Sequence, residues 1–388
     1  MKFNLNGCNV VSLVLLTSVF WIGCEKAEPA AAILPPPVPI VEKPLPVAAK
    51  PAEISGVMID ISSFALVAEM GVGWNLGNSF DVRSKDKTVW GNPLSSVAIV
   101  QSVKAMGFTS LRIPITWNFD QLQSAPYTIE LAYLERIKVI VDEALKNDMY
   151  VIINTHHDDW IVPTNASSFE VKNRLAAIWK QVAVYFQSYG DHLIFETLNE
   201  PRLMGSAEEW NGGTQEGRDN VNAYHKAGVD AIRATAGNNA KRQIMLSTYA
   251  ASSAPNAMGG LVVPNNDPNI IISIHSYFPW SFAGDIPGVS TWGSDAEKKD
   301  LENELDRIRD KWIVQEKRPV VLGEWGTTNK SNLDQRVAYS RFYAAAAVKR
   351  GFVPIIWDDG GNFGFFNRNN LTWKYPEIAK AVLEAKAK

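Results

Sequence analysis

Eight short apolar segments constrain the fold of this chain more than any other feature. None of them alternates apolar and polar residues, so each resembles a parallel strand that is buried on both faces. Amphipathic helical patterns lie between most of them, most clearly over residues 131–145, 175–186 and after 332. The segments are Val72–Leu76, Ser110–Ile115, Tyr150–Asn154, Leu193–Thr197, Gln243–Ser247, Ile270–Ile274, Pro319–Leu322 and Val353–Trp357.

Eight strand–helix alternations over about 330 residues predict an α/β chain folded as a (β/α)8 TIM barrel. The fifth helix is weakly supported, because Ala254–Pro264 is rich in Gly and Pro and reads partly as loop. A doubly wound open sheet is the alternative architecture. Against it, the glycines Gly71, Gly73 and Gly77 have the wrong spacing for a dinucleotide-binding fingerprint.

Composition places the chain among globular proteins and excludes several function classes. Its 388 residues are 46% apolar, 20% charged and carry a net charge of −3. Without a basic block, nothing draws it to nucleic acid. Its two cysteines, Cys8 and Cys24, precede the apolar segments, so the predicted domain has no disulfide, thiolate nucleophile or cysteine zinc site.

The first 53 residues do not read as part of the barrel. Lys2 precedes an apolar run over residues 10–23, which has the length of a secretory signal peptide. The run ends in WIGC, which resembles a bacterial lipoprotein cleavage box, so Cys24 is either the acylated residue of a membrane-attached lipoprotein or part of an ordinary signal. We predict a signal peptide over 1–24, a Pro/Ala-rich linker over 25–53 and a catalytic domain over 54–388, located in the cell envelope or secreted.

Polar and aromatic residues collect where the predicted strands end, which in a barrel is the face that carries function. The carboxylates Glu200 and Glu324 each follow an apolar strand directly, and the fourth and seventh strands lie nearly opposite each other in a barrel of eight. Two opposed carboxyl groups are the machinery of glycoside hydrolysis, in which one donates a proton and the other attacks the anomeric carbon or activates water. The other strand-end residues include Trp74, Asn78, Arg112, His156, His157, Asp158, Asp159, Trp160, Asn199, His275, Tyr277, Trp325, Trp357, Asp358 and Asp359.

The motifs GWNLGN, WGNP, GFTSLRIPITW, NTHHDDW, LNEP, IHSYFPW and GEWG together resemble glycoside hydrolase family 5, in particular its broad endoglucanase and xyloglucanase branch. The resemblance implies a retaining endo-β-1,4-glucanase with Glu200 as acid/base and Glu324 as nucleophile. It also places Arg112, His156, Asn199, His275, Tyr277 and Trp357 on active-site positions, whereas His157 is found in only some members.

Physical roles follow for these residues. Arg112 would lower the pKa of Glu324 and Tyr277 would hold it, whereas Glu200 needs a less polar setting without a close cation to keep its proton. Asn199 would bind a sugar 2-hydroxyl. The histidines would bind sugar hydroxyls or orient neighbours, and Trp357 would form the floor of the cleaving subsite. We expect Asn78, Trp74, Trp160, Trp280 and Trp325 to contact substrate, and Trp179 to pack in the core.

Several alternatives remain open at this point. A catalytic metal held by the histidines is disfavoured because no HxH or HExxH pattern is present, and the acidic residues at 158, 159, 358 and 359 offer a calcium site without specific support. We therefore expect no cofactor and no catalytic metal, a β-glucan partner, and a monomer. The substrate alternatives are xyloglucan, mixed-linkage glucan, mannan and xylan. A non-catalytic glycan-binding barrel is the alternative from another class.

Overall fold

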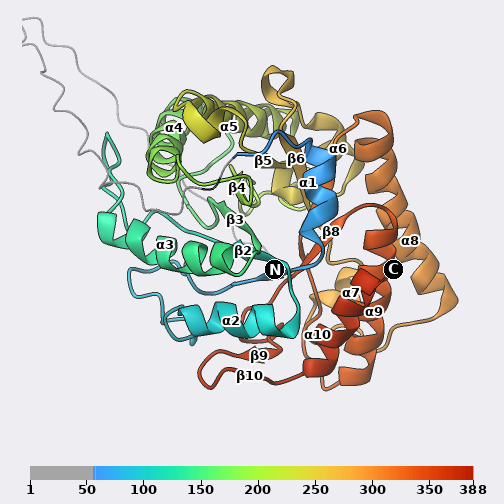
Figure 1. Ribbon diagram of the computed structural model, residues 1–388. Coiled ribbons are helices and arrows are strands. Elements are labelled where there is room, and N and C mark those ends of the chain that lie inside the picture. The colour runs from blue at the N-terminus through green and yellow to red at the C-terminus, as the bar shows by residue number, and fades with distance from the viewer. Residues whose placement is uncertain (1–55, 57, 388) are drawn as a thin grey trace, which may run out of the picture. The chain divides into compact units, whose positions relative to one another are not determined.

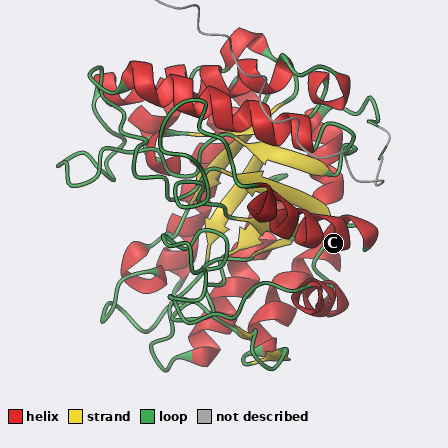
Figure 2. Ribbon diagram, turned by 90° about the vertical axis from the view of Figure 1, so that its left-hand side faces the viewer, coloured by secondary structure: helices red, strands yellow, loops and turns green. Residues whose placement is uncertain are grey.

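A closed barrel of eight parallel strands forms the centre of the protein (Figures 1 and 2). The computed structural model describes residues 56 and 58–387, so the predicted leader and nearly all of the linker, with both cysteines, lie outside the described residues. Each strand pairs with the next, and β1 closes the barrel against β8. The strands are β1 Gly73–Asn75, β2 Ser110–Ile113, β3 Tyr150–Asn154, β4 Leu193–Glu196, β5 Ile244–Ser247, β6 Ile270–His275, β7 Val320–Trp325 and β8 Val353–Ile356.

All eight predicted strands are therefore confirmed, and the closed sheet excludes the doubly wound alternative. Helices surround the strands (Figure 2). The fifth connection is mostly irregular, as its Gly and Pro content predicts, with only a six-residue helix. The helices are α1 Ser63–Met70, α2 Val97–Met106, α3 Leu131–Lys146, α4 Ser168–Tyr185, α5 Gln215–Arg233, α6 Pro255–Gly260, α7 Trp280–Ala283, α8 Asp295–Arg309, α9 Leu333–Lys349 and α10 Pro376–Leu383.

Short elements complete the connections. A π-helical turn, Asp310–Gln315, extends α8, and a small antiparallel hairpin of β9 Phe366–Asn367 and β10 Thr372–Trp373 follows β8. The 3-10 turns are Gly237–Ala240, Tyr249–Ala251, Pro264–Asn266 and Glu384–Ala387. Within residues 56 and 58–387, the helices are all too short or too polar to cross a bilayer.

The lower half of the barrel interior is apolar and is closed from below by α1. Leu66, Val67 and Met70 of this helix pack against a cluster of inward-facing strand residues. The carbonyl of Met70 accepts hydrogen bonds from the hydroxyls of Thr109 and Ser110, both at 2.7 Å, which ties the helix to β2. The inward-facing residues include Ile152, Ile194, Met245, Ile271, Val321 and Ile355.

The upper half of the interior is polar, although the strands themselves read as apolar. Asn154 and Glu196 lie two residues after Ile152 and Ile194. Because side chains alternate between the two faces of a strand, these polar residues lie on the same inner surface as the two isoleucines. The same step leads from Ile271 to Ser273 and from Val321 to Gly323. This polar layer lies directly below the carboxyl ends of the strands, where the candidate site is.

A β-bulge between β6 and β7 sets the direction of Glu324. Ile274 pairs with Leu322, but His275 then pairs with Glu324, so Gly323 is the extra residue. A side chain at Gly323 would lie 2.8 Å from the hydroxyl of Ser273 and 2.9 Å from Nε2 of His275, so only glycine fits there. Because a bulge re-aims the side chain that follows it, Glu324 faces the mouth of the barrel instead of the helices outside.

At the opposite, amino-terminal end of the strands, a buried arginine joins β4 to β5. The guanidinium of Arg242 is completely buried, and its five N–H groups all donate at 2.7 to 3.2 Å. Its acceptors are the side-chain oxygen of Asn239 and the carbonyls of Phe186, Tyr189, Gly190 and Leu193. The positive charge is thus solvated by the backbone of the turn between α4 and β4.

We predict that Arg242→Met lowers the free energy of unfolding by about 3 kcal/mol or more, because methionine leaves these buried acceptors without donors. Urea unfolding measures the difference. Arg341→Met is the control: Arg341 pairs with Glu384 at a half-exposed site, where an ion pair contributes about 1 kcal/mol or less. Equal unfolding midpoints for the two variants would contradict the structural role of Arg242.

Candidate active site

Two clefts open at the carboxyl ends of the strands and meet at Glu200. The larger has a volume of about 630 Å³ and is lined by Glu200, Trp210, His275, Tyr277 and Trp280 among others. The smaller, of about 270 Å³, is lined by Glu200 together with Arg83, Trp90, His156, His157, Asp159 and Arg202 among others. A long ligand lying along both clefts would pass over Glu200.

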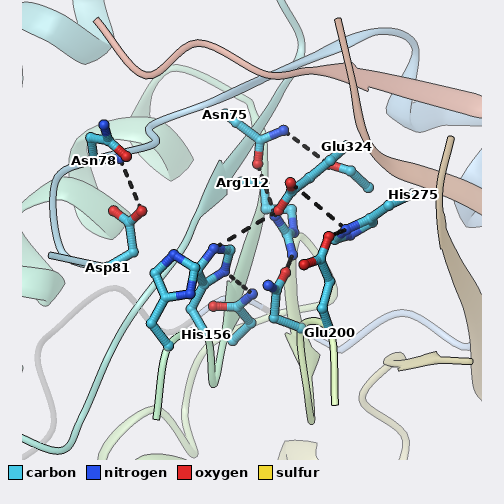
Figure 3. A network of polar contacts seen from close by, with 12 residues as sticks. Asn75, Asn78, Asp81, Arg112, His156, Glu200, His275 and Glu324 are labelled. Carbon is cyan, nitrogen blue, oxygen red and sulfur yellow. Dashed lines mark hydrogen bonds and ion pairs between the residues drawn. The ribbon is translucent and has the colours of Figure 1, made fainter. Parts of the chain in front are cut away.

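Arg112 on β2 is the centre of the polar layer, and its side chain is completely buried (Figure 3). It donates to Glu196 and to Glu324, both at 2.8 Å. It also donates to the side-chain oxygens of Asn75 at 3.0 Å and of Asn199 at 2.6 Å. Burial alone would lower the pKa of Arg112, but the two carboxylates raise it above its ordinary value. The predicted pairing of Arg112 with Glu324 is confirmed.

Glu324 is held from several sides. The hydroxyl of Tyr277 donates to its Oε2 at 3.0 Å while Arg112 donates to Oε1. His275 Nδ1 lies 3.7 Å from Oε2, and His156 Nε2 lies 3.9 Å from Oε1. One carboxylate oxygen of Glu324, one of Glu200 and a ring nitrogen of His275 lie within 4.8 Å of one another. The two carboxyl groups therefore face each other across the mouth of the barrel.

Glu200 follows β4 and has two polar partners. His275 Nδ1 lies 2.8 Å from its Oε1, and Arg202 Nη1 donates to its Oε2 at 3.2 Å. The expectation that Glu200 stands without a close cation is therefore wrong. Sequence reasoning missed Arg202 although it is only two residues further along the chain, because the direction of a loop side chain cannot be read from a pattern.

Burial and charge shift the pKa values of the two carboxyl groups in opposite directions. Burial raises the pKa of Glu324 above its ordinary value, against the opposing effects of His275 and Arg112. Burial would also raise the pKa of Glu200, but the hydrogen bond with His275 and the charge of Arg202 lower it below its ordinary value. These directions describe the ligand-free site.

The two adjacent histidines have different surroundings. Asn154 donates to Nδ1 of His156 at 3.2 Å, so the neutral ring carries its proton on Nε2, facing Glu324. The ring of His156 lies parallel to that of Trp357, with centroids 5.9 Å apart. His157 instead faces the smaller cleft, beside Trp90. Burial lowers the pKa of His156 well below its ordinary value and that of His157 to about 4, so both rings are neutral at pH 7.

Trp357 follows β8 and is 9% exposed. It lies beside Gly77, which belongs to the loop after β1. A side chain at Gly77 would come within 2.6 Å of its indole ring. The glycine of the GWNLGN motif is therefore needed for the backbone to approach the tryptophan. Asn199 has its side-chain oxygen occupied by Arg112, which leaves its NH₂ group as the part able to donate to a ligand.

The expectations for the other tryptophans are partly wrong. Trp74 and Trp325 are completely buried and cannot touch a ligand. Trp74 donates to Asp358 at 3.3 Å, and Trp325 stacks on Tyr343 at a centroid distance of 4.3 Å. An indole that ends a strand can face the surrounding helices as easily as the mouth, and nothing in the residue type distinguishes the two.

The remaining predicted contacts divide between the cleft and the packing around it. Trp280 lines the larger cleft and is 61% exposed. Trp160 instead packs against the core and under Arg174. The backbone N–H of Asn78 donates to Asp81 at 3.0 Å (Figure 3). Trp179 is in the core as predicted.

Carboxylate and histidine groups that could surround an ion occur twice in the described part of the chain: Glu200 with His275 and Glu324, and Asp81 with His156 and His157. Both oxygens of Asp81 already accept backbone N–H groups. Among the acidic residues considered for calcium, Asp158 accepts from the N–H groups of Trp117 and Asn118, and Asp358 pairs with Arg368. These carboxylates therefore have local structural partners.

Glu196 is the central residue that sequence reasoning missed. It is completely buried and accepts from Arg112 at 2.8 Å, Asn154 at 3.0 Å and Ser273 at 2.7 Å. The step of two from a buried interior residue, Ile194, was the available signal. Arg202, Trp210 and Trp90 were also missed; they lie on connections whose course the strand pattern does not fix.

A (β/α)8 barrel with two facing carboxyl groups and an aromatic-lined cleft at the carboxyl ends of its strands has the architecture of a glycoside hydrolase. The family model described as "Cellulase (glycosyl hydrolase family 5)" matches residues 72–362. The chain belongs to glycosyl hydrolase family 5.

Individual relatives agree with this assignment. "Endoglucanase B" of Clostridium cellulovorans is 47% identical over 336 residues, which cover 84% of this chain and 76% of that protein. The solved structure of ZgEngAGH5_4 in complex with a cellotriose is 53% identical with a TM-score of 0.83, covering 84% of this chain and 100% of the other. A "GH5-4 broad specificity endoglucanase" from Clostridium acetobutylicum is 43% identical with a TM-score of 0.82 and the same two coverages.

We predict that Glu196→Gln shifts the acidic limb of the pH–activity profile to lower pH by about half a unit to one unit. Glutamine keeps the shape but removes the negative charge that competes with Glu324 for Arg112, so the pKa of Glu324 falls and it ionises earlier. The measurement is kcat between pH 3 and 7, which reports the enzyme–substrate complex. Ser273→Ala removes a neutral partner of Glu196 and should leave the limb in place. An unchanged limb in Glu196→Gln would show that Glu196 only supports the fold.

Proposed function

We propose that the protein is a retaining endo-β-1,4-glucanase in which Glu324 is the nucleophile and Glu200 is the acid/base. The observation that carries this proposal is the approach of the two carboxyl groups to within 4.8 Å between their nearest oxygens. Retaining enzymes have carboxyl groups about 5 to 5.5 Å apart, whereas inverting enzymes need about 6.5 to 9.5 Å to fit a water molecule between carboxylate and sugar. The family membership and the named activities of the relatives support the same activity.

In the first step, an oxygen of Glu324 attacks the anomeric carbon and the bond to the glycosidic oxygen breaks. That oxygen takes the proton of Glu200 as it leaves. In the second step, a water molecule gives a proton to Glu200. The oxygen of this water attacks the anomeric carbon, and the bond between that carbon and Glu324 breaks. Both carboxyl groups return to their starting protonation states, and the chemistry requires no cofactor.

The bound sugar has to shift the pKa values of Glu200 and Glu324 in the directions that the two roles require. A glycosidic oxygen placed at Glu200 accepts a hydrogen bond, which favours the protonated form of that carboxyl group. Positive charge that develops at the anomeric carbon favours the ionised form of Glu324. Arg112 and Tyr277 already donate to both oxygens of Glu324, so its ionised form needs no rearrangement.

The substrate class we propose is a soluble β-1,4-linked glucan, with xyloglucan and mixed-linkage glucan on the same scaffold as the principal alternatives. The clefts on both sides of Glu200 fit a chain that extends in both directions, and the broad specificity named for the Clostridium acetobutylicum relative supports several β-glucans. A panel of barley glucan, xyloglucan, mannan and xylan, with reducing-end release as the readout, distinguishes these from one another and from a non-catalytic barrel. We further propose that the leader at 1–24 directs export, either as a lipoprotein signal with Cys24 as the lipid attachment point or as an ordinary signal peptide. We also propose that the barrel acts as a monomer.

We predict that the first products keep the β configuration at the anomeric carbon, because two displacements at one carbon restore its stereochemistry. Proton NMR of the products in the first minutes, before mutarotation, gives the configuration. Glu324→Gln should abolish the signal. An α anomer in the early spectra would overturn the assignment of Glu324 as the nucleophile.

We predict that Glu200→Ala loses about 100-fold or more activity on glucan but much less on aryl glycosides with acidic phenols, since these leaving groups depart without a proton. Glu324→Ala should lose both activities. The ratio of kcat/KM for the two substrates measures the effect. If Glu200→Ala were equally defective on both, Glu200 would not be the acid.

A further inference from the structure

The side chain of Arg202 contacts the candidate acid/base, a carboxylate and an aromatic ring at once. Nη1 donates to Oε2 of Glu200 at 3.2 Å and to its backbone carbonyl at 3.0 Å. Nε donates to Oε1 of Glu209 at 3.0 Å. The guanidinium lies over the indole of Trp210, with 4.2 Å between Cζ and the ring centroid. Arg202 lines the smaller cleft and joins Glu200, which lines both clefts, to Trp210, which lines the larger one.

The connection that carries this cluster is anchored at several points, so Arg202 is held in place. The carbonyl of Pro201 accepts from the N–H of Ala250 at 2.9 Å. The N–H of Leu203 donates to the hydroxyl of Tyr249 at 2.8 Å. The second oxygen of Glu209 accepts from the N–H of Gly205 at 2.7 Å, which closes the loop on itself. Side-chain exposures of only 18% for Arg202 and 20% for Glu209 place their interaction in a partly shielded environment.

A cation at this position opposes the first step and favours the second. Arginine stabilises the ionised form of Glu200, whereas the first step needs Glu200 to carry a proton. The second step needs the ionised form, which accepts a proton from water. A cation that lowers the pKa of Glu200 moderately therefore helps the second step, whereas one that lowers it strongly would stop the first step. Glu209 supplies the moderation, because its negative charge faces the same guanidinium.

We propose, resting on the proposed function, that Arg202 is a positioning residue that orients the acid/base carboxyl, and that Glu209 limits how strongly the charge of Arg202 acts on it. Trp210 fixes the plane of the guanidinium between the two carboxylates. Four other titratable groups act on Glu200. They are His157, which follows β3, His275 at the end of β6, Tyr277, which follows β6, and Glu324 of β7. Among these four residues, His275 hydrogen-bonds Glu200, and neither residue 202 nor residue 209 takes part in that bond.

The test compares the basic limb of the kcat profile on a cello-oligosaccharide, because kcat reports the enzyme–substrate complex, in which the bound sugar keeps the proton on Glu200. Arg202→Met should move this limb up by about one pH unit, since Glu200 then keeps its proton longer. Glu209→Gln should move it down, since the full charge of Arg202 then acts on Glu200. The double variant should match Arg202→Met, because Glu209 acts through Arg202.

Arg218→Met is the matched control, since Arg218 is anchored to Gly212 and Gln215 at the far end of the same connection and does not contact Glu200. Its basic limb should be that of the wild type, and thermal unfolding should show that all variants are folded. A purely structural role for the Arg202–Glu209 pair predicts lower activity in all the variants with no movement of the limb. That result, or movement of both single variants in the same direction, would overturn the proposal.

A direct titration separates this inference from the proposed function. Carboxyl ¹³C NMR of the glutamate-labelled protein, with Glu200 assigned by comparison with Glu200→Gln, gives the pKa of Glu200 without turnover. The pKa should rise in Arg202→Met and fall in Glu209→Gln. If the wild-type protein hydrolysed no β-glucan but the variants showed these shifts, only the proposed function would be refuted. An active protein without the shifts would refute only the role of Arg202.

Discussion

The ion pairs of Arg112 organise the whole upper half of the barrel. A charge that is fully removed from water is destabilising unless its hydrogen bonds are satisfied, and here residues of β1, β4 and β7 contribute partners. Glu196 and Glu324 supply the negative charge. Asn75 bridges the arginine to the carbonyl of Gly323 at 2.9 Å, which is the bulge residue that turns Glu324 toward the mouth. The orientation of the candidate nucleophile thus depends on the same network that makes the buried charge tolerable.

This network explains which parts of the molecule could be predicted from the sequence. Strands buried on both faces give an apolar run that is visible in one dimension, and all eight were found. Glu200 and Glu324 were found because each follows such a run. An arginine in an apolar strand is unfavourable unless it is paired, and the family resemblance implied that Glu324 is its partner. Glu196 was not found, because an inward-facing carboxylate within a strand looks like the end of the strand.

The failures among the tryptophans and at Glu200 have a common physical reason. Whether a strand-end side chain faces the mouth or the surrounding helices depends on bulges and on the loop that follows, as Trp325 and Glu324 demonstrate by standing next to each other and facing opposite ways. Arg202 likewise reaches Glu200 from a loop that is anchored by Tyr249 and by Glu209. Long-range contacts of this kind leave no periodic signal in the sequence.

The two clefts bear on where a glucan chain would be cut. An exo-acting enzyme needs one side of its catalytic residues closed, because it recognises a chain end. Here open clefts of about 270 and 630 Å³ lie on the two sides of Glu200. The tryptophans that line them, Trp90 on one side and Trp210 and Trp280 on the other, offer flat apolar surfaces for sugar rings on both sides of the bond to be cleaved. Because Arg202 stacks on Trp210 and also contacts Glu200, a sugar bound against Trp210 would lie next to the guanidinium beside the candidate acid. Clefts on both sides of Glu200 suit attack at internal bonds, where sugar units occupy both sides of the bond that is cleaved.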